Sequence, residues 1–182
     1  MNLSELTMIV ATDLDGAIGK GNTLPWRHRG DMAHFKKTTQ DSVVIMGNKT
    51  FQSMNNKPLK NRINLVLSRN YDAVGFQAPA EPDDITTLMP VRSVEDALAT
   101  AKEHWPDKMI YVIGGASIYE AFLPRTDVII QTRLDLRVEG ADAFFPFHQI
   151  DPINWVREVQ EFGPGQTHPD DVAYEIIHHY RK

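Results

Sequence analysis

Short apolar runs bounded by turn residues set the hydrophobic pattern along much of the chain. Five runs are rich in Val and Ile and hardly alternate with polar residues, which is typical of strands buried on both faces of a sheet. They cover residues 6–12, 42–47, 63–68, 109–115 and 127–134. Two later stretches, 154–162 and 172–182, alternate apolar and polar positions, which favours antiparallel strands.

Helical patterns lie between these runs, at residues 31–38, 48–54, 93–105 and 116–124. The third begins with Ser93 and has Asp96 three residues later, a pair typical of a capped helix start. The alternation of strands and helices predicts a single α/β domain over residues 1–182. Its central sheet should be mostly parallel with an antiparallel C-terminal edge, and helices should cover both faces.

Residues 71–91 interrupt this alternation with three prolines. Such a stretch predicts a long surface loop that could contain a short strand. It has the composition of a solvated connection rather than of a binding site.

Composition and charge exclude several classes of protein. The 182 residues carry a formal net charge of -5, which argues against nucleic acid as a general partner. The chain has no cysteine, so disulfides and thiolate metal sites are excluded, and its seven histidines show no metal-ligand spacing. No stretch reaches the ~18 apolar residues of a membrane span, and the N-terminus lacks a signal-peptide pattern. We expect a soluble cytoplasmic monomer without a metal.

Small and basic residues follow three of the predicted strands. Gly47 stands after the second, followed by Lys49 and Thr50; Ser68 and Arg69 stand after the third; Gly114 to Ser117 follow the fourth. Ligands of open α/β sheets bind outside the carboxyl ends of the strands, and this set would suit a phosphate-rich ligand such as a dinucleotide. The alternative is a set of plain turns that bind nothing, since neither glycine turn matches a standard nucleotide-binding motif.

A single carboxylate, Asp31, stands among aromatic, apolar and basic residues in the stretch 17–39. Asp31 and Phe35 are four residues apart and would share a helix face. The pattern favours a pocket with an apolar wall and one acid, which would bind adjacent N–H groups of a heterocycle. The alternatives are that Asp31 caps the helix and that Trp26 and Phe35 only pack in the core.

Basic residues flank this pocket pattern. We expect those around Asp31, including Arg27, His28 and Arg29, to face solvent mostly. Arg62 stands just before a buried strand, where a guanidinium could hold a substrate carboxylate as a fork. The alternative is an exposed, salt-bridging arginine.

Seven motifs, in order and near the family spacing, resemble dihydrofolate reductase. They are AIGKGNTLPW, the pair Asp31 and Phe35, VVIMGNKTF, PLKNRINLVLSR, YVIGGASIYEAFL, IQTRLD and VEGADAFFP. The resemblance extends from about residue 7 to the terminal YEIIHHY. It implies an enzyme that reduces 7,8-dihydrofolate to tetrahydrofolate with NADPH, and that antifolates inhibit.

The resemblance also implies roles at the substrate. Asp31 would bind the pterin and favour protonation of its ring nitrogen, with water as the carrier. Trp26 would anchor an ordered water, and Leu24 would belong to a mobile loop that closes over the nicotinamide. Thr132 would bond the acid, and Arg62 would hold the glutamate α-carboxylate. The apolar walls would be Ile9, Val10, Met32, Phe35, Met54 and Leu59.

Further residues match positions that bind the cofactor. Tyr119 would lie near the nicotinamide. The others are Ala11, Ile18, Gly47, Lys49, Thr50, Ser68, Arg69, Gly114, Gly115, Ala116, Ser117 and Ile118. Asn48 and Ser117 stand where many bacterial members have arginines, so Lys49 and Arg69 are expected to carry the preference for NADPH.

Two other functions remain open from the sequence. One is a reductase of the same fold acting on another heterocycle, such as the aminopyrimidine reductase of riboflavin synthesis. The other is a binding protein without turnover. Trp26, Asp31, Phe35 and Arg62 together favour a folate, because the first rival needs no contacts to a benzoyl-glutamate tail.

Overall fold

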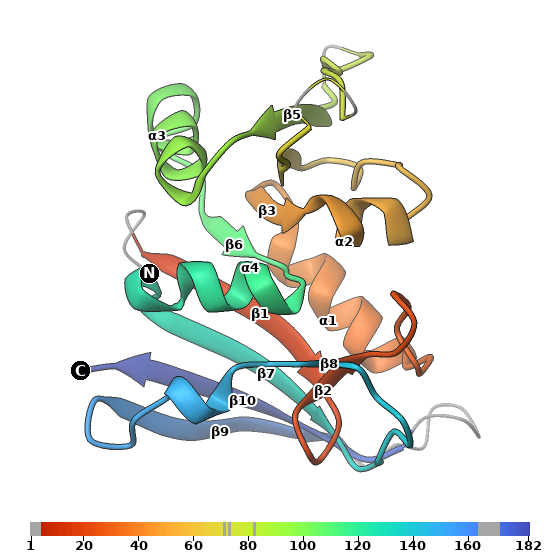
Figure 1. Ribbon diagram of the computed structural model, residues 1–182. Helices are drawn as coiled ribbons and strands as arrows, with labels where there is room; N and C mark the ends of the chain where they lie inside the picture. The colour runs from red at the N-terminus through yellow and green to blue at the C-terminus, as the bar shows by residue number, and fades with distance from the viewer. Residues whose placement is uncertain (1–4, 71, 73, 82, 164–171) are drawn as a thin grey trace.

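An eight-stranded sheet runs through the centre of the protein (Figure 1). The computed structural model describes residues 5–70, 72, 74–81, 83–163 and 172–182. The strand order is β5-β4-β3-β6-β1-β7-β10-β9. The strands are β1 (Leu6–Thr12), β3 (Val43–Gly47), β4 (Ile63–Leu67), β5 (Thr87–Val91), β6 (Ile110–Val112), β7 (Val128–Leu134), β9 (Trp155–Gly163) and β10 (Tyr174–Arg181). All pairs from β5 to β7 are parallel, and β10 is antiparallel to both neighbours, which confirms the predicted sheet.

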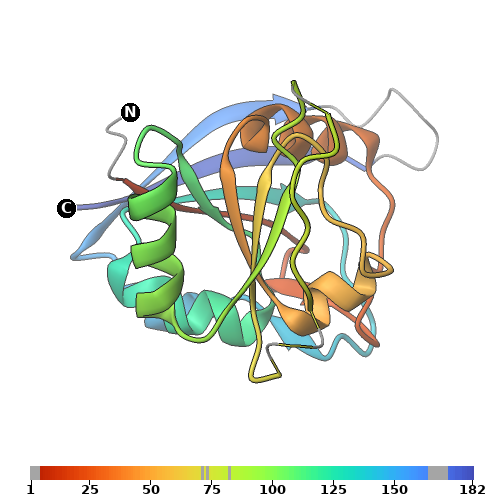
Figure 2. The ribbon, with the colours of Figure 1, turned by 90° about the horizontal axis from the view of Figure 1, so that it is seen from above.

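Among the described residues, four helices connect the strands and cover both faces of the sheet, as the sequence predicts (Figure 2). They are α1 (Arg29–Thr39), α2 (Asn48–Ser53), α3 (Val94–His104) and α4 (Ala116–Phe122), with short 3-10 turns at Leu123–Arg125 and Phe147–Gln149. Ser93 caps α3 by accepting the Asp96 backbone N–H at 3.1 Å, as predicted. None of the helices in the described ranges is long and apolar enough to cross a membrane.

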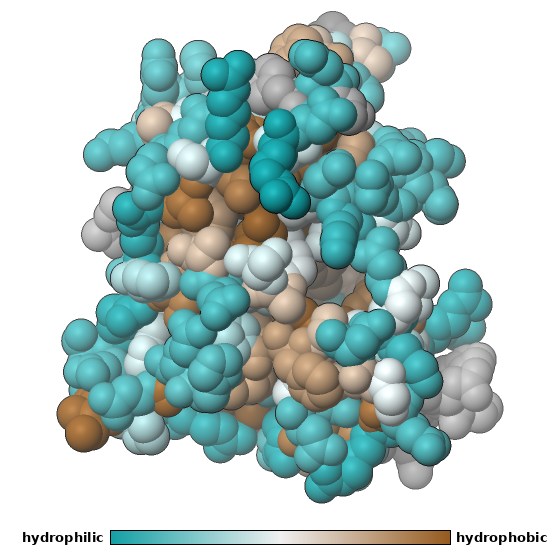
Figure 3. All heavy atoms as spheres, in the orientation of Figure 1, coloured by the Kyte–Doolittle hydropathy of each residue, from teal (hydrophilic) through white to brown (hydrophobic). Residues whose placement is uncertain are grey.

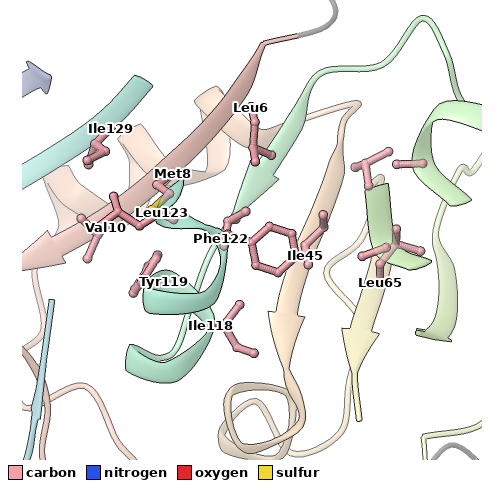
Figure 4. Packing of buried hydrophobic residues seen from close by; sticks show 14 of the residues in the cluster. Leu6, Met8, Val10, Ile45, Leu65, Ile118, Tyr119, Phe122, Leu123 and Ile129 are labelled. Carbon is pink, nitrogen blue, oxygen red and sulfur yellow. The ribbon is translucent and has the colours of Figure 1, made fainter. Parts of the chain in front are cut away.

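The strands are buried on both faces, so successive side chains enter two different hydrophobic clusters. On β1, Met8 and Val10 pack in the cluster under α3 and α4, together with Ile118 and Phe122 (Figure 4). Their neighbour Ile9 packs in the opposite cluster, with Phe51 of α2 and Phe35 of α1 at its border. The near-continuous apolar runs of the sequence follow from this double burial.

The segment 71–91 contains the short strand that its sequence allowed within the predicted surface loop. Its last five residues form β5, which pairs in parallel with β4 and closes that edge of the sheet. Pro90 is tolerated there because an edge strand needs fewer backbone donors. Positions 71, 73 and 82 of the predicted loop lie outside the described residues.

A small second sheet holds the chain ahead of α1. Its strands are β2 (Ala17–Gly19) and β8 (Ala143–Phe144), which pair antiparallel. Sequence patterns missed both, because each is too short to show a period. The pairing fixes the start of the segment that leads to Asp31.

A buried polar chain ties β10 to β1 across β7. The Thr12 hydroxyl donates to the Asp13 carbonyl and accepts from Gln131 Nε2 at 2.8 Å. The Gln131 oxygen therefore faces His179 Nε2, at 2.9 Å, and this nitrogen must carry the proton. Burial, with the charges of Arg157 and His178, lowers the pKa of His179 to about 4.

Folding stability should fall as the pH drops from about 6.5 toward 4. The unfolded chain gains a proton on His179 near the ordinary histidine pKa of 6.5, whereas the folded chain resists it until about 4. We expect a loss of about 2 kcal/mol across that window, measured by denaturant unfolding at several pH values. His179→Gln should remove the largest part of this dependence and leave the part from His34 and His178, because burial also lowers the pKa of those two histidines. The exposed control His104→Gln should keep all of it.

Candidate active site

Asp31 lies in the first turn of α1, where the helix meets the sheet. Its side chain is 7% exposed, and it accepts a hydrogen bond from the Thr132 hydroxyl on β7. Burial raises the pKa of the Asp31 carboxyl, while the Thr132 bond partly opposes the rise. The result is a buried carboxylate whose protonation depends strongly on what lies beside it.

Asp31 does not cap its helix, which was the alternative for this residue. His28 is the cap, and its Nδ1 accepts the Asp31 backbone N–H at 3.1 Å. The prediction that the basic residues here face solvent is therefore wrong for His28, which is only 3% exposed, and holds for the exposed Arg27 and Arg29. Histidine is an uncommon helix cap, so no local sequence pattern indicates this role.

The predicted apolar wall is only partly assembled on one face. Phe35, Met54 and Leu59 are half-buried and pack against the cluster that contains Ile9. Met32 is 52% exposed and projects from the same helix as Asp31. Half-exposed apolar side chains beside a buried acid leave apolar surface available to a ring.

Val10 does not join this wall. Its side chain packs on the opposite face, in the cluster with Tyr119, because consecutive residues of a strand point in opposite directions. Any contact of Val10 with a ligand at the Asp31 side would come from its backbone.

Arg62 is buried, not the exposed salt-bridging residue of the alternative. It is 5% exposed, and its guanidinium donates to Thr39 Oγ1 (3.1 Å), the Lys60 carbonyl (2.7 Å) and the Lys36 carbonyl (3.2 Å). Burial lowers its pKa, yet a guanidinium stays protonated. These bonds occupy three of five N–H groups and fix the direction of the fork.

Two glycine turns meet at the carboxyl ends of β3 and β6. The Gly47 N–H donates to the Gly114 carbonyl at 2.8 Å, and the Gly114–Gly115 peptide is cis. A Cβ on Gly47 would lie 2.8 Å from Ile118 Cγ1, and a Cβ on Gly114 would lie 2.8 Å from Tyr119 Cε2. No larger residue fits either turn without a shift, which explains the glycines by packing.

Tyr119 lies under this pair of turns rather than free in a cleft. Its hydroxyl donates to the Ile9 carbonyl at 2.8 Å, and its side chain is 4% exposed. Burial, followed by the nearby Asp31 charge, raises its pKa. Tyr119 thus joins the glycine turn to the strand that carries the wall residue Ile9.

Candidate phosphate-binding side chains border the glycine turns. Lys49 and Ser117 are exposed, while the Thr50 hydroxyl would lie 3.4 Å from a Cβ on Gly115. On the face that Figure 3 shows, polar residues surround apolar residues that are visible in the middle, between α3 and α4. The remaining cofactor candidates on these elements are Ala116, which is half-buried, and Ile118, which is buried.

The other cofactor candidates lie at nearby strand ends. Arg69 is exposed after β4, and the Ser68 hydroxyl bonds the Asn70 carbonyl at 2.9 Å. Ala11 is half-buried near the end of β1, and Ile18 is half-buried in the middle of β2. The structure therefore keeps Arg69 open to solvent but uses the Ser68 hydroxyl locally.

Leu24 and Trp26 lie on the segment between β2 and α1. Leu24 is 55% exposed, and the buried Trp26 Nε1 has no hydrogen-bond partner among the described residues. A pocket of about 450 Å³, lined by residues 24–28, Leu136 and Val172, opens beside them. This pocket includes neither Asp31 nor the apolar wall.

Comparison with known proteins identifies the family of this chain. The family model for dihydrofolate reductase matches residues 5–181. The chain belongs to the dihydrofolate reductase family. It is 37% identical to the dihydrofolate reductase of Neisseria gonorrhoeae over 98% of this chain and 99% of that protein. It is 33% identical to that of Bacillus subtilis (strain 168), over 97% and 95%.

A solved structure shows the same fold with ligands bound. It is dihydrofolate reductase from Enterococcus faecalis complexed with NADP(H) and RAB-propyl, with a TM-score of 0.80 and 30% identity. The match covers 99% of this chain and 98% of that one. The family that the sequence motifs resemble is therefore confirmed.

Proposed function

We propose that this chain reduces 7,8-dihydrofolate to 5,6,7,8-tetrahydrofolate with NADPH as the reductant. The observation that carries the proposal is the buried Asp31 carboxylate, bonded to Thr132 and bordered by half-exposed apolar side chains. Adjacent N–H groups of a pterin match a carboxylate as a bidentate partner. Family membership and the neighbour's bound NADP(H) support the same chemistry.

The chain's residues fit a dinucleotide at the glycine turns. Gly47 and Gly114 let two backbone segments approach closely, and Lys49, Thr50, Ser117 and Arg69 supply donors around them. When bound, NADPH would supply a hydride to the pterin C=N carbon. Arg69, exposed after β4, would pair with the 2′-phosphate, and Arg69→Ala should narrow the preference for NADPH over NADH.

Asp31 assists protonation of the pterin rather than hydride transfer. The adjacent pterin nitrogen gains one proton from solvent, so the reaction balances as one hydride and one proton added to one C=N bond. The negative charge of Asp31 holds the pterin and favours its protonated form, because opposite charges interact strongly where water is excluded. Thr132 keeps the carboxylate oriented. Trp26 Nε1, which has no partner among the described residues, would be available to donate to a water.

Arg62 should distinguish a folate from the other heterocycles. Its buried fork would hold the glutamate α-carboxylate, beyond Leu59 and Phe35 along the apolar wall. We expect Arg62→Leu to raise the KM for dihydrofolate about thirtyfold, since a charge-assisted bond is worth roughly 2 kcal/mol.

The control for Arg62→Leu is a substrate, 7,8-dihydropteroate, which lacks the glutamate. Its KM should stay the same in the variant, so general damage to the site would show as equal losses on both substrates. Wild-type turnover is followed by the loss of reduced-nicotinamide absorbance. Folded wild type that leaves dihydrofolate unreduced would contradict the proposed function.

We further propose that residues 1–182 act as one domain and as a cytoplasmic monomer. One sheet takes strands from near both ends of the chain, which supports a single folding unit. The exposed apolar residues of β9 are Val156, Val159 and Phe162. Charged and polar residues at 157–158 and 160–161 interrupt them, which disfavours edge-to-edge pairing. Light scattering across a concentration series tests the monomer.

A further inference from the structure

His28 makes two hydrogen bonds between segments far apart in the chain. Its Nδ1 accepts the backbone N–H of Asp31 at 3.1 Å, and its Nε2 lies 2.9 Å from the Val172 carbonyl oxygen. The backbone of His28 is extended, as a helix cap requires. The ring therefore joins the start of α1 to the segment that enters β10.

These two partners define the protonation state of the ring. A nitrogen that accepts an N–H must be unprotonated, so Nδ1 carries no hydrogen. A carbonyl oxygen only accepts, so Nε2 carries the hydrogen. His28 is thus a neutral imidazole, whereas an imidazolium would donate from both nitrogens and lose its bond to Asp31.

Packing leaves the ring little freedom. The Tyr174 ring meets it edge-on, with centroids 5.0 Å apart and planes at 80°. A Cβ on Gly30 would lie 3.2 Å from His28 Cε1 and 3.3 Å from Tyr174 Cε1, so Gly30 makes room for the ring. A buried ring held on three sides transmits the position of β10 to the first turn of α1.

We propose that His28 is a positioning residue for Asp31, using its neutral ring to hold the acid's backbone against the entry to β10. The inference rests on the proposed function, because it assigns His28 to the binding of dihydrofolate by Asp31. Both ring nitrogens of His28 are used in bonds to the chain, one of them to the acid's backbone. The glycine turns at Gly47 and Gly114 lie on other strands, so the cofactor side does not depend on this link.

Kinetics of three variants test the role. We expect His28→Leu to raise the KM for dihydrofolate about tenfold, equivalent to about 1.4 kcal/mol of binding free energy, because the Asp31 backbone loses the bond that holds the acid in place. The KM for NADPH should stay unchanged. His28→Asn should restore most of the affinity, because its amide oxygen can accept the Asp31 N–H. The control His34→Leu, on the same helix but without contact to Asp31's backbone, should behave as wild type.

Two results would overturn the proposal. One is a His28→Leu variant with a lower Tm and both KM values unchanged, which would make the cap purely structural. The other is an equal rise in both KM values, which would indicate general loosening. The role is supported if His28→Leu raises only the KM for dihydrofolate and His28→Asn restores most of the affinity.

A readout without turnover separates this inference from the proposed function. In protein labelled with ¹⁵N-histidine, His28 should show a protonated Nε2 and an unprotonated Nδ1 at neutral pH, and a protonated Nδ1 would contradict the proposal. Dihydrofolate affinity, measured by quenching of tryptophan fluorescence, should fall selectively in His28→Leu. Wild type that binds dihydrofolate but does not reduce it would end the proposed function and leave this binding test intact.

Discussion

Asp31→Asn should lower kcat/KM for dihydrofolate by about a hundredfold to a thousandfold at neutral pH, the usual loss when a buried charge that assists protonation is removed. The amide keeps the shape and can still bond Thr132, so the fold should survive. What is lost is the negative charge opposite the pterin. The remaining turnover should rise toward acid pH, where solvent supplies the proton more readily.

The pH profile gives this prediction a second test. Because burial raises the pKa of Asp31, the plot of wild-type kcat/KM against pH should change slope at a pH above that at which ordinary aspartates titrate. The Asp31→Asn variant should lose that change of slope. Asp107→Asn, on an exposed residue, is the matched control and should keep both rate and profile. Full activity of Asp31→Asn at neutral pH would remove Asp31 from the mechanism.

Gly114→Ala should be the most damaging change at the glycine turns. Gly114 has φ +104°, and the new Cβ would lie 2.8 Å from Tyr119 Cε2. Left-handed strain and overpacking together should cost about 3 kcal/mol, and Tm should fall by about 10 °C. Displacement of Tyr119 would also break its bond to the Ile9 carbonyl, and NADPH affinity should fall with stability.

Gly75→Ala separates the two costs at Gly114. Gly75 also has a positive φ, +75°, but a Cβ there meets nothing within 4 Å. It should lose only about 1 kcal/mol and bind NADPH normally. Calorimetry and NADPH titration of both variants check the difference. Equal losses in the two variants would show that backbone strain alone, and not the contact with Tyr119, explains the glycine.

The main sheet could be predicted from the sequence because strands that are buried on both faces consist of long apolar runs. The run at residues 6–12 matches β1, and Ser93 caps α3 as its pattern indicates. The sequence allowed a short strand within 71–91 but did not place it, because Pro90 usually argues against a strand and is tolerated only at an edge. Edge position is a property of the whole sheet, so no local pattern could reveal it.

The site was predictable where chemistry depends on residue type and hidden where it depends on geometry. Asp31 stood out as one acid among apolar and basic residues. The direction of Val10 and the local bond of Ser68 follow from the pleat and from a turn, which the family motifs do not specify. His28 was misread because a histidine between two arginines suggests surface charge, whereas its two partners, Asp31 and Val172, meet only after folding.

The central place of β1 has a consequence for synthesis on the ribosome. β1 is made first but lies between β6 and β7, and the acid on α1 is completed by Thr132 of β7. Pairing of parallel strands distant in sequence is slow and leaves apolar edges exposed meanwhile. A nascent chain that stops between β6 and β7 would expose one edge of β1, and its Asp31 would lack the Thr132 partner. Chaperone dependence should therefore be greatest in that interval, and activity arises late in translation.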